Sequence, residues 1–191
     1  TINVTWHLLD FTFAGDSTFV FVGYVNASGD RLGTVLKSIN SGITWQNLNL
    51  EQNYGKEISG VKALDSSHLY IWGKTYLMDA QPVVLQSADG GVSWSSASFP
   101  NLFKEKWNQN SQITSLGIKK WPAAYAFTNA QSALAASTIK LHVKTDDGLN
   151  WFFANNDFFE TIYDMHCTSN GTLIASHEII RLTTDDFVTY D

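Results

Sequence analysis

Acidic side chains are the first candidates for chemistry in this sequence, because two carboxylates about 5 to 10 Å apart are enough for glycoside hydrolysis. Among the acids outside the repeated segments described below, the candidates are Asp10, Asp30, Asp79, Glu160, Asp164 and Glu178. Their spacing along the chain singles out no pair, and acidic residues on loops are usually solvated. We therefore favour solvated carboxylates and keep a catalytic pair as the alternative.

Histidine, cysteine and serine show no spacing typical of a reactive site. The histidines are His7, His68, His142, His166 and His177, and they form neither an H-x-H nor an H-E-x-x-H pattern. Cys167 is the single cysteine, which excludes an intrachain disulfide and favours a buried strand thiol. Neither a Gly-x-Ser-x-Gly motif nor a glycine-rich phosphate loop occurs. We expect no catalytic residue, no metal site and no cofactor.

The composition excludes several classes of partner. The chain has 191 residues, a net charge of −6 and only 12 lysines and arginines. Phosphate binding needs clustered basic residues, so we expect no nucleic-acid partner. No run approaches the roughly 18 to 20 apolar residues of a membrane-spanning helix, and no charged-then-apolar leader is visible. We therefore expect no membrane span, and the sequence assigns no compartment.

An internal repeat organises the chain. Segments 38–45, 87–94 and 144–151 align without gaps and end in tryptophan, and a fourth at 183–190 ends in tyrosine and has Phe187 in place of glycine. The aligned positions are Ser38, Asn40, Gly42 and Trp45; Ser87, Asp89, Gly91 and Trp94; Asp146, Gly148 and Trp151; and Asp185 and Tyr190.

Each aligned position has a structural use. The acid or amide can accept hydrogen bonds from N–H groups of its own tight turn. The glycine permits positive φ, the hydroxyl adds a side-chain bond, and the aromatic packs the hairpin against neighbouring strands. These residues therefore predict turns and not reactive groups.

The spacing of the repeat predicts the architecture. Residues 3–6 match the last four positions of the first segment, so the closing aromatics lie at positions 6, 45, 94, 151 and 190. Repeats of about 40 to 50 residues are typical of four-stranded propeller blades. Apolar runs bounded by Gly, Asp, Asn and Ser precede each segment, and no apolar period of 3.6 residues appears. We predict an all-β propeller of four-stranded antiparallel blades, with essentially no helix, in a single domain over 1–191. The blades are placed at about 7–50, 57–99, 112–155 and 159–191, the last completed by residues 3–9 either within the chain or by strand exchange with a second chain.

The segments resemble the Asp-box, or bacterial neuraminidase repeat, whose pattern is Ser/Thr-x-Asp-x-Gly-x-Thr-Trp. The copy at 87–94 matches every position if Ser93 stands for threonine. The resemblance extends to sialidases, to the photosystem II assembly-factor group and to sortilin-type propellers. It implies that each box joins the third and fourth strands of a blade, on the side away from the ligand face.

A sialidase site is not possible in this chain alone. Sialidases hold the substrate carboxylate with three arginines, for which lysine is a poor substitute. The chain contains only Arg31 and Arg181, and it lacks the Arg-Ile-Pro motif of that family.

On the ligand face of such a propeller, loops converge from all blades, and function usually lies on loops. The binding residues that we expect there are Arg31, Tyr76, Lys104 and Trp107; the alternative for Trp107 is that it covers the edge of the third blade. We predict a non-catalytic scaffold that binds a protein partner. The alternative is a carbohydrate-active protein, a lectin or a fragment of a glycoside hydrolase, with Trp107, Trp72 or Tyr76 stacking on sugar rings.

Overall fold

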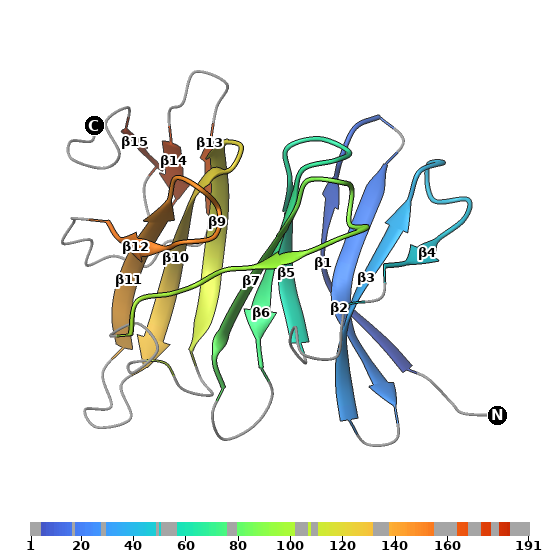
Figure 1. The fold of residues 1–191 in the computed structure, drawn as a ribbon, viewed down its shortest axis with the longest axis horizontal. Helices are drawn as coiled ribbons and strands as arrows, with labels where there is room; N and C mark the ends of the chain where they lie inside the picture. Colours follow the sequence, from blue (N-terminus) through green and yellow to red (C-terminus); the bar gives the residue numbers. More distant parts are fainter. Residues whose placement is uncertain are drawn as a thin grey trace. The chain divides into compact units, whose positions relative to one another are not determined.

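The computed structural model describes residues 5–16, 18–27, 30–48, 50, 57–75, 80–101, 107, 111–131, 138–154, 164–167, 173–176 and 180–183. Every element bounded within these residues is a β-strand (Figure 1), which confirms the all-β prediction. No helix in the described part of the chain is long and apolar enough to cross a bilayer. The chain divides into two compact units, residues 1–97 and 98–191, and each is described by itself.

The first unit holds two antiparallel four-stranded sheets, each made of consecutive strands. The first sheet has the order β1 (Thr5–Phe13), β2 (Phe19–Ala27), β3 (Asp30–Ser38) and β4 (Gln46–Asn47). The second has the order β5 (Glu57–Ala63), β6 (Leu69–Lys74), β7 (Pro82–Ser87) and β8 (Ser95–Ser96). Short polar turns make this simple order possible, because hairpins join neighbouring strands directly. In one of them, Asp65 Oδ1 accepts the N–H groups of Ser67 and His68 at 2.8 and 2.9 Å.

The core of the first unit lies between its two sheets. Alternate residues of a strand point to opposite faces, so Val20 and Val22 on β2 are both buried toward the second sheet. The second sheet meets them with Leu69 and Ile71 from β6. The remaining members of this cluster are Ala14, Val35, Leu48, Ile58, Val61, Val83 and Leu85. β1 and β5 lie side by side in this packing (Figure 1).

The N-terminal strand differs from its predicted role. Residues 5–9 form the first half of β1 and pair with β2, from Thr5 opposite Asn26 to Leu8 opposite Gly23. His7 stacks on Tyr24 with ring centroids 4.6 Å apart, which strengthens this register. The expectation that residues 3–9 complete the last blade is therefore corrected for residues 5–9, and residues 3 and 4 lie outside the described part.

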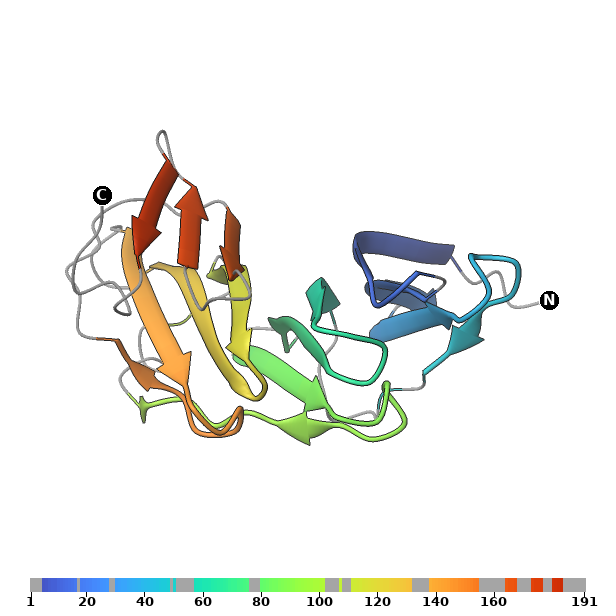
Figure 2. The same cartoon turned by 90° about the horizontal axis from the view of Figure 1, so that it is seen from above.

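The second unit repeats the pattern. Its first sheet has the order β9 (Gln112–Lys120), β10 (Ala123–Gln131), β11 (Thr138–Thr145) and β12 (Phe152–Phe153). The other sheet, drawn in red in Figure 2, has three strands in the described residues: β13 (Asp164–Cys167), β14 (Leu173–Ser176) and β15 (Ile180–Thr183). The two sheets meet where β13 packs on β9, with Met165 and Cys167 against Gly117.

Candidate functional site

The turn at 38–45 is held by its own side chains. Ser38 Oγ accepts the N–H of Gly42 at 2.8 Å and donates to Asn40 Oδ1 at 3.0 Å. Asn40 Oδ1 accepts the N–H of Thr44 at 2.9 Å, while its amide donates to the Thr44 hydroxyl at 2.8 Å. Gly42 has φ of 85°, in the region that favours glycine. The hydroxyl, amide and glycine of this segment thus all serve the turn.

The turn at 87–94 has the same connections with a carboxylate in place of the amide. Ser87 Oγ accepts the N–H of Gly91 at 2.8 Å, and Asp89 accepts the N–H and hydroxyl of Ser93 at 2.9 and 2.5 Å. Donation from the Ser93 hydroxyl and N–H lowers the pKa of Asp89 from 3.8 to about 2. Asp89 is therefore an ionised acceptor at neutral pH and has no proton to donate.

The third turn has a register that the pattern does not show. Thr145 takes the place of the serine: it donates to Asp147 Oδ1 at 3.0 Å and accepts the N–H of Gly148 at 2.9 Å. Asp147, and not the aligned Asp146, accepts the N–H groups of Leu149 and Asn150 at 2.9 and 2.7 Å. Donation from Asn150 N–H, followed by its side-chain amide, lowers the pKa of Asp147 well below its usual range. The turn is one residue shorter between hydroxyl and glycine than the other two.

The closing tryptophans pack against aromatic or core residues. Trp45 contacts Phe21 with ring centroids 5.1 Å apart, and Trp94 packs against the core of the first unit. Trp151 is buried beside Phe99 at 5.8 Å, and its indole N–H donates to the carbonyl of Gly148 at 3.3 Å. Asp185 and Tyr190, the residues expected to form the fourth turn, lie outside the described residues.

Lys37 connects the two sheets of the first unit next to these turns. Its ammonium donates to the carbonyls of Gly90 at 2.8 Å and Ser66 at 3.1 Å. Burial lowers the pKa of Lys37, and the charge of Asp89 opposes this shift. Two of the three ammonium protons are engaged, so a third donor remains at this position.

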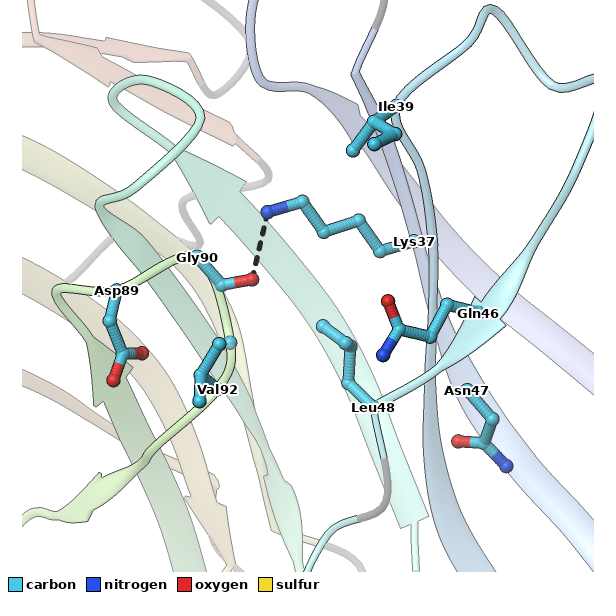
Figure 3. Close-up of a pocket in the computed structure, with 9 residues that line it drawn as sticks. Lys37, Ile39, Gln46, Asn47, Leu48, Asp89, Gly90 and Val92 are labelled. Carbon is cyan, nitrogen blue, oxygen red and sulfur yellow. Dashed lines mark hydrogen bonds between the residues drawn. The ribbon is translucent and has the colours of Figure 1, made fainter.

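A groove of about 330 Å³ lies beside Lys37 (Figure 3). We call it the β4 groove; it is lined by Lys37, Ile39, Gln46, Asn47, Leu48, Asp89, Gly90, Gly91 and Val92. Ile39 and Val92 are 70 and 83% exposed, whereas Leu48 is buried. The groove therefore combines aliphatic side chains with two amides, one ammonium group and the carboxylate of Asp89, all within the first unit.

The binding residues expected on loops are placed differently or not at all. Trp107 is only 6% exposed, which agrees with the interpretation that it covers an edge and not with an exposed anchor. Arg31 lies on β3 opposite Asn26, and its side chain is not described. Tyr76 and Lys104 lie outside the described residues. Trp107 is therefore the one member of this set whose side chain the structure describes.

The candidate catalytic acids are mostly outside the described side chains. Asp79, Glu160 and Glu178 lie outside the described residues, and Asp30 and Asp164 are described only by their backbone. Asp10 accepts the N–H groups of Phe11 and Val61 at 2.8 and 3.0 Å, so both of its oxygens serve the backbone. Among the described residues, no group of three or more His, Cys, Asp or Glu could hold a metal ion.

Sequence reasoning missed the β4 groove, although a signal was present. The sixth position of the aligned segments is apolar in each of them: Ile43, Val92, Leu149 and Val188. Ile43 and Val92 are among the most exposed apolar residues of the described chain. A residue that only stabilises a turn does not need an apolar side chain that points to solvent. The repeated apolar residue therefore indicated a binding surface.

Comparisons with known proteins identify the fold. No protein-family model and no curated protein matches the chain. Similar solved structures include YCF48 bound to D1 peptide (13% identity, TM-score 0.52) and YCF48 from Cyanidioschyzon merolae (19%, 0.53). A third is the GH93 alpha-L-arabinofuranosidase of Fusarium graminearum with arabinobiose (12%, 0.53).

These matches cover 100, 96 and 92% of this chain, which in turn spans 67, 55 and 56% of theirs. Such low identity shows the fold alone. Together with the antiparallel four-stranded sheets, it confirms the predicted β-propeller class.

Proposed function

We propose that the chain is a non-catalytic β-propeller scaffold that binds an extended segment of a protein partner in the β4 groove. The observation that carries this proposal is the groove's lining: an aliphatic floor and rims next to amide and ammonium groups. Amides and an ammonium can bond the carbonyls and N–H groups of a main chain, while Ile39 and Val92 can hold an aliphatic side chain. None of the nine lining residues is aromatic, so a stacked sugar ring fits it less well.

The position of β4 supports an extended ligand. β4 is an edge strand of its sheet, paired on one side with β3 through Leu36–Asn47 and Lys37–Gln46. The outer edge of a strand can pair with an added segment, and side-chain pockets then select its residues. The fold likeness is compatible with a peptide ligand, because one similar propeller is YCF48 bound to D1 peptide.

We further infer that the three described turns are Asp-box turns. Their hydroxyl–acid–glycine bonds are those expected for the pattern, with Asn40 as the acid's substitute in the first. The turn at 87–94 fixes one wall of the groove, since Asp89 and Gly91 belong both to this turn and to the lining.

The alternative function is carbohydrate recognition, favoured by the likeness to an arabinofuranosidase with arabinobiose. Two of the three aromatic residues expected to stack on sugars, Trp72 and Trp107, are buried in this structure. A sugar site would therefore need Tyr76, which lies outside the described residues, or other aromatic residues.

A displayed library of random peptides, panned on the purified chain, tests the proposal. Enriched peptides should bind the wild type in fluorescence anisotropy and lose at least tenfold in affinity to Val92→Arg, which fills one rim of the groove. Ile43→Arg is the matched control, since Ile43 is similarly exposed but does not line the groove. Equal loss in both variants, or none in either, would overturn the groove assignment. Binding or turnover of arabinobiose or another glycan without peptide enrichment would favour the alternative.

A further inference from the structure

The outer strand of the first sheet presents the main chain of one residue at its open edge. Leu48 donates its N–H to the carbonyl of Val35 at 2.8 Å, toward β3. In an antiparallel pair, the N–H and C=O of one residue point to one side of the strand, and those of the next residue point to the other side. Asn47 lies opposite Leu36 in this ladder, so its N–H and C=O point away from β3.

The outer strands of two further sheets have the same arrangement. Directly after β8 and β12, Ala97 and Ala154 donate their N–H groups inward at 2.9 and 3.0 Å, as Leu48 does after β4. The residues whose main chain faces outward are then Ser96 and Phe153. The direction of the Asn47 main chain is therefore a property of the blade. It is set entirely by pairing within the first unit.

The side chains of β4 alternate between the groove and the other face of the sheet. Figure 3 shows those of Gln46 and Leu48 directed toward the turn of the second sheet, and that of Asn47 directed away from it. Asn47 Oδ1 accepts the hydroxyl of Thr34 at 3.4 Å on that other face. Leu48 is buried against Gly91 on the groove side. The open edge and the groove thus meet along the same two-residue strand.

These directions set the register of a segment that adds to the edge. An antiparallel segment can exchange two hydrogen bonds with Asn47 through a single residue, which we call the paired residue. The residue before it then lies opposite Leu48, and we call it the anchor. Residues opposite each other in a sheet point to the same face, so the anchor's side chain enters the groove beside Leu48 and Val92. The paired residue points away from the groove, as Asn47 does.

β4 is too short to hold a strand by main-chain bonds alone. It has two residues, and short edge strands prevent pairing with arbitrary segments. The groove supplies the missing contacts, because Leu48, Gly91 and Val92 form an aliphatic surface where the anchor enters. A second copy of β4, paired through its own Asn47, would bring Gln46 to the anchor position, and an amide does not suit this surface. A partner segment with an aliphatic anchor does.

We propose that the partner segment adds to β4 as an antiparallel strand in this one register, with an aliphatic anchor directly before the residue that pairs with Asn47. This proposal rests on the proposed function and deepens it by naming the direction of the segment, the bonded atoms and the side chain that is selected. Valine, isoleucine or leucine suits the anchor, because Leu48, Gly91 and Val92 offer it no hydrogen-bonding side chain. The side chain of the paired residue is not selected by the groove.

N-methylation of a bound peptide tests the register. The probe is a peptide enriched on the purified chain whose affinity Val92→Arg lowers. A double-mutant cycle between Val92→Ala and alanine substitutions along the peptide identifies the anchor as the residue coupled to Val92. Methylating the N–H of the next residue should lower affinity by about tenfold or more, because that N–H donates to the Asn47 carbonyl. Methylating the anchor, or the residue after the paired one, should cost less than about threefold, because these N–H groups point away from β4.

A substitution at Asn47 tests the other hydrogen bond from the protein side. Asn47→Pro removes the outward N–H and keeps the bonds between β3 and β4, since proline is tolerated where the N–H of an edge strand faces outward. It should lower the affinity for the peptide by about tenfold. Asn47→Ala is the matched control: it loses the same side chain but keeps the N–H, and its affinity should stay within about threefold of the wild type. Thermal unfolding of both variants verifies that they fold, and the N-methylation scan does not require Asn47→Pro.

The possible outcomes separate this proposal from the one on which it rests. Loss of affinity on methylating the anchor but not the next residue would indicate a parallel strand. Equal effects at all three positions, or full affinity in a folded Asn47→Pro variant, would show that the segment does not pair with β4. Each of these results overturns the register and leaves the groove assignment in place. Enriched peptides that do not respond to Val92→Arg, or no enrichment, would overturn both proposals.

Discussion

The carboxylate of Asp10 accepts a hydrogen bond from the backbone N–H of Val61 at 3.0 Å, which ties β1 of the first sheet to β5 of the second. Its other oxygen accepts the N–H of Phe11 at 2.8 Å. Phe11 and Val61 occupy equivalent positions after the bulges of their strands, so one acid satisfies the same N–H group in two repeats. Asp10 is thus a structural link between sheets and is poorly placed to act as one of a catalytic pair.

Loss of this link should destabilise the first unit. Asp10→Ala leaves two N–H groups without their acceptor, and we expect a loss of about 1 to 3 kcal/mol in the free energy of unfolding. Asp10→Asn should lower the free energy of unfolding by less, because its amide oxygen can still accept one hydrogen bond. Urea denaturation followed by tryptophan fluorescence measures both. Asp16→Ala, at an exposed turn position, is the control and should stay within about 0.5 kcal/mol of the wild type. Equal effects of Asp10→Ala and Asp16→Ala would contradict the structural role.

Glycine 91 should be intolerant of a side chain for two separate reasons. Its φ is 93°, and an added Cβ would overlap Leu48 Cδ1. We expect Gly91→Ala to cost about 2 to 4 kcal/mol, as strain and overpacking add. Gly15→Ala measures the cost of the positive φ alone, because Gly15 has φ of 110° and nothing within 4 Å of an added Cβ. Thermal unfolding of the two variants compares them. A Gly91 variant no less stable than the Gly15 variant would show that Leu48 moves aside freely.

The charge of Asp89 should make the first unit sensitive to acid. Its pKa in the folded chain, about 2, lies below the ordinary 3.8, first because the Ser93 hydroxyl donates to the ionised form. The carboxylate therefore stabilises the fold above about pH 4, and this contribution is lost as the pH falls toward about 2. Asp89→Asn, which imitates Asn40 of the first turn, should lose less than about 1 kcal/mol at pH 7, because an exposed charge is screened. The difference from the wild type should shrink toward about pH 2.

Urea midpoints measured at several pH values check this expectation, with Asp16→Asn as the control for net charge. A constant difference between Asp89→Asn and the wild type across the acid range would show that the ionised form gains nothing from the turn.

Features that depend on neighbouring residues in the chain could be predicted from sequence, whereas features that depend on distant contacts could not. The turns at 38–45 and 87–94 follow from a hydroxyl, an acid or amide and a glycine within five residues, and such local bonds leave a readable pattern. Trp107 lies in a segment that mixes aromatic and basic residues, which is typical of an exposed anchor, yet its side chain is buried. The repeated apolar residue of the turns indicated a surface, but the position of the β4 groove could not be predicted, because the groove joins β4 to a turn more than 40 residues away.

The choice between Asp146 and Asp147 shows a different limit. Alignment without gaps from Trp151 backward matches Asp146 to Asp89, because it assumes that all turns have equal length. The first turn has positive φ at both Ser41 and Gly42, and the second at Gly90 and Gly91, but the third has it at Gly148 alone. The third turn therefore has one residue fewer in the left-handed region. As a result, its hydroxyl residue, Thr145, and its acid, Asp147, each lie one position closer to the glycine than in the other two turns. Side-chain bonds and not the alignment therefore define the register.

The register of the third turn predicts different effects for substitutions of its two neighbouring acids. Asp147→Ala removes the acceptor of three backbone and side-chain N–H groups and of the Thr145 hydroxyl, so we expect it to lower the free energy of unfolding by about 1 to 3 kcal/mol. Asp146→Ala alters the neighbouring exposed acid, makes the same change in net charge, and should stay within about 0.5 kcal/mol of the wild type. Urea denaturation of the two variants side by side measures the difference. A larger loss in Asp146→Ala than in Asp147→Ala would restore the gap-free alignment and show that the turn has the same length as the others.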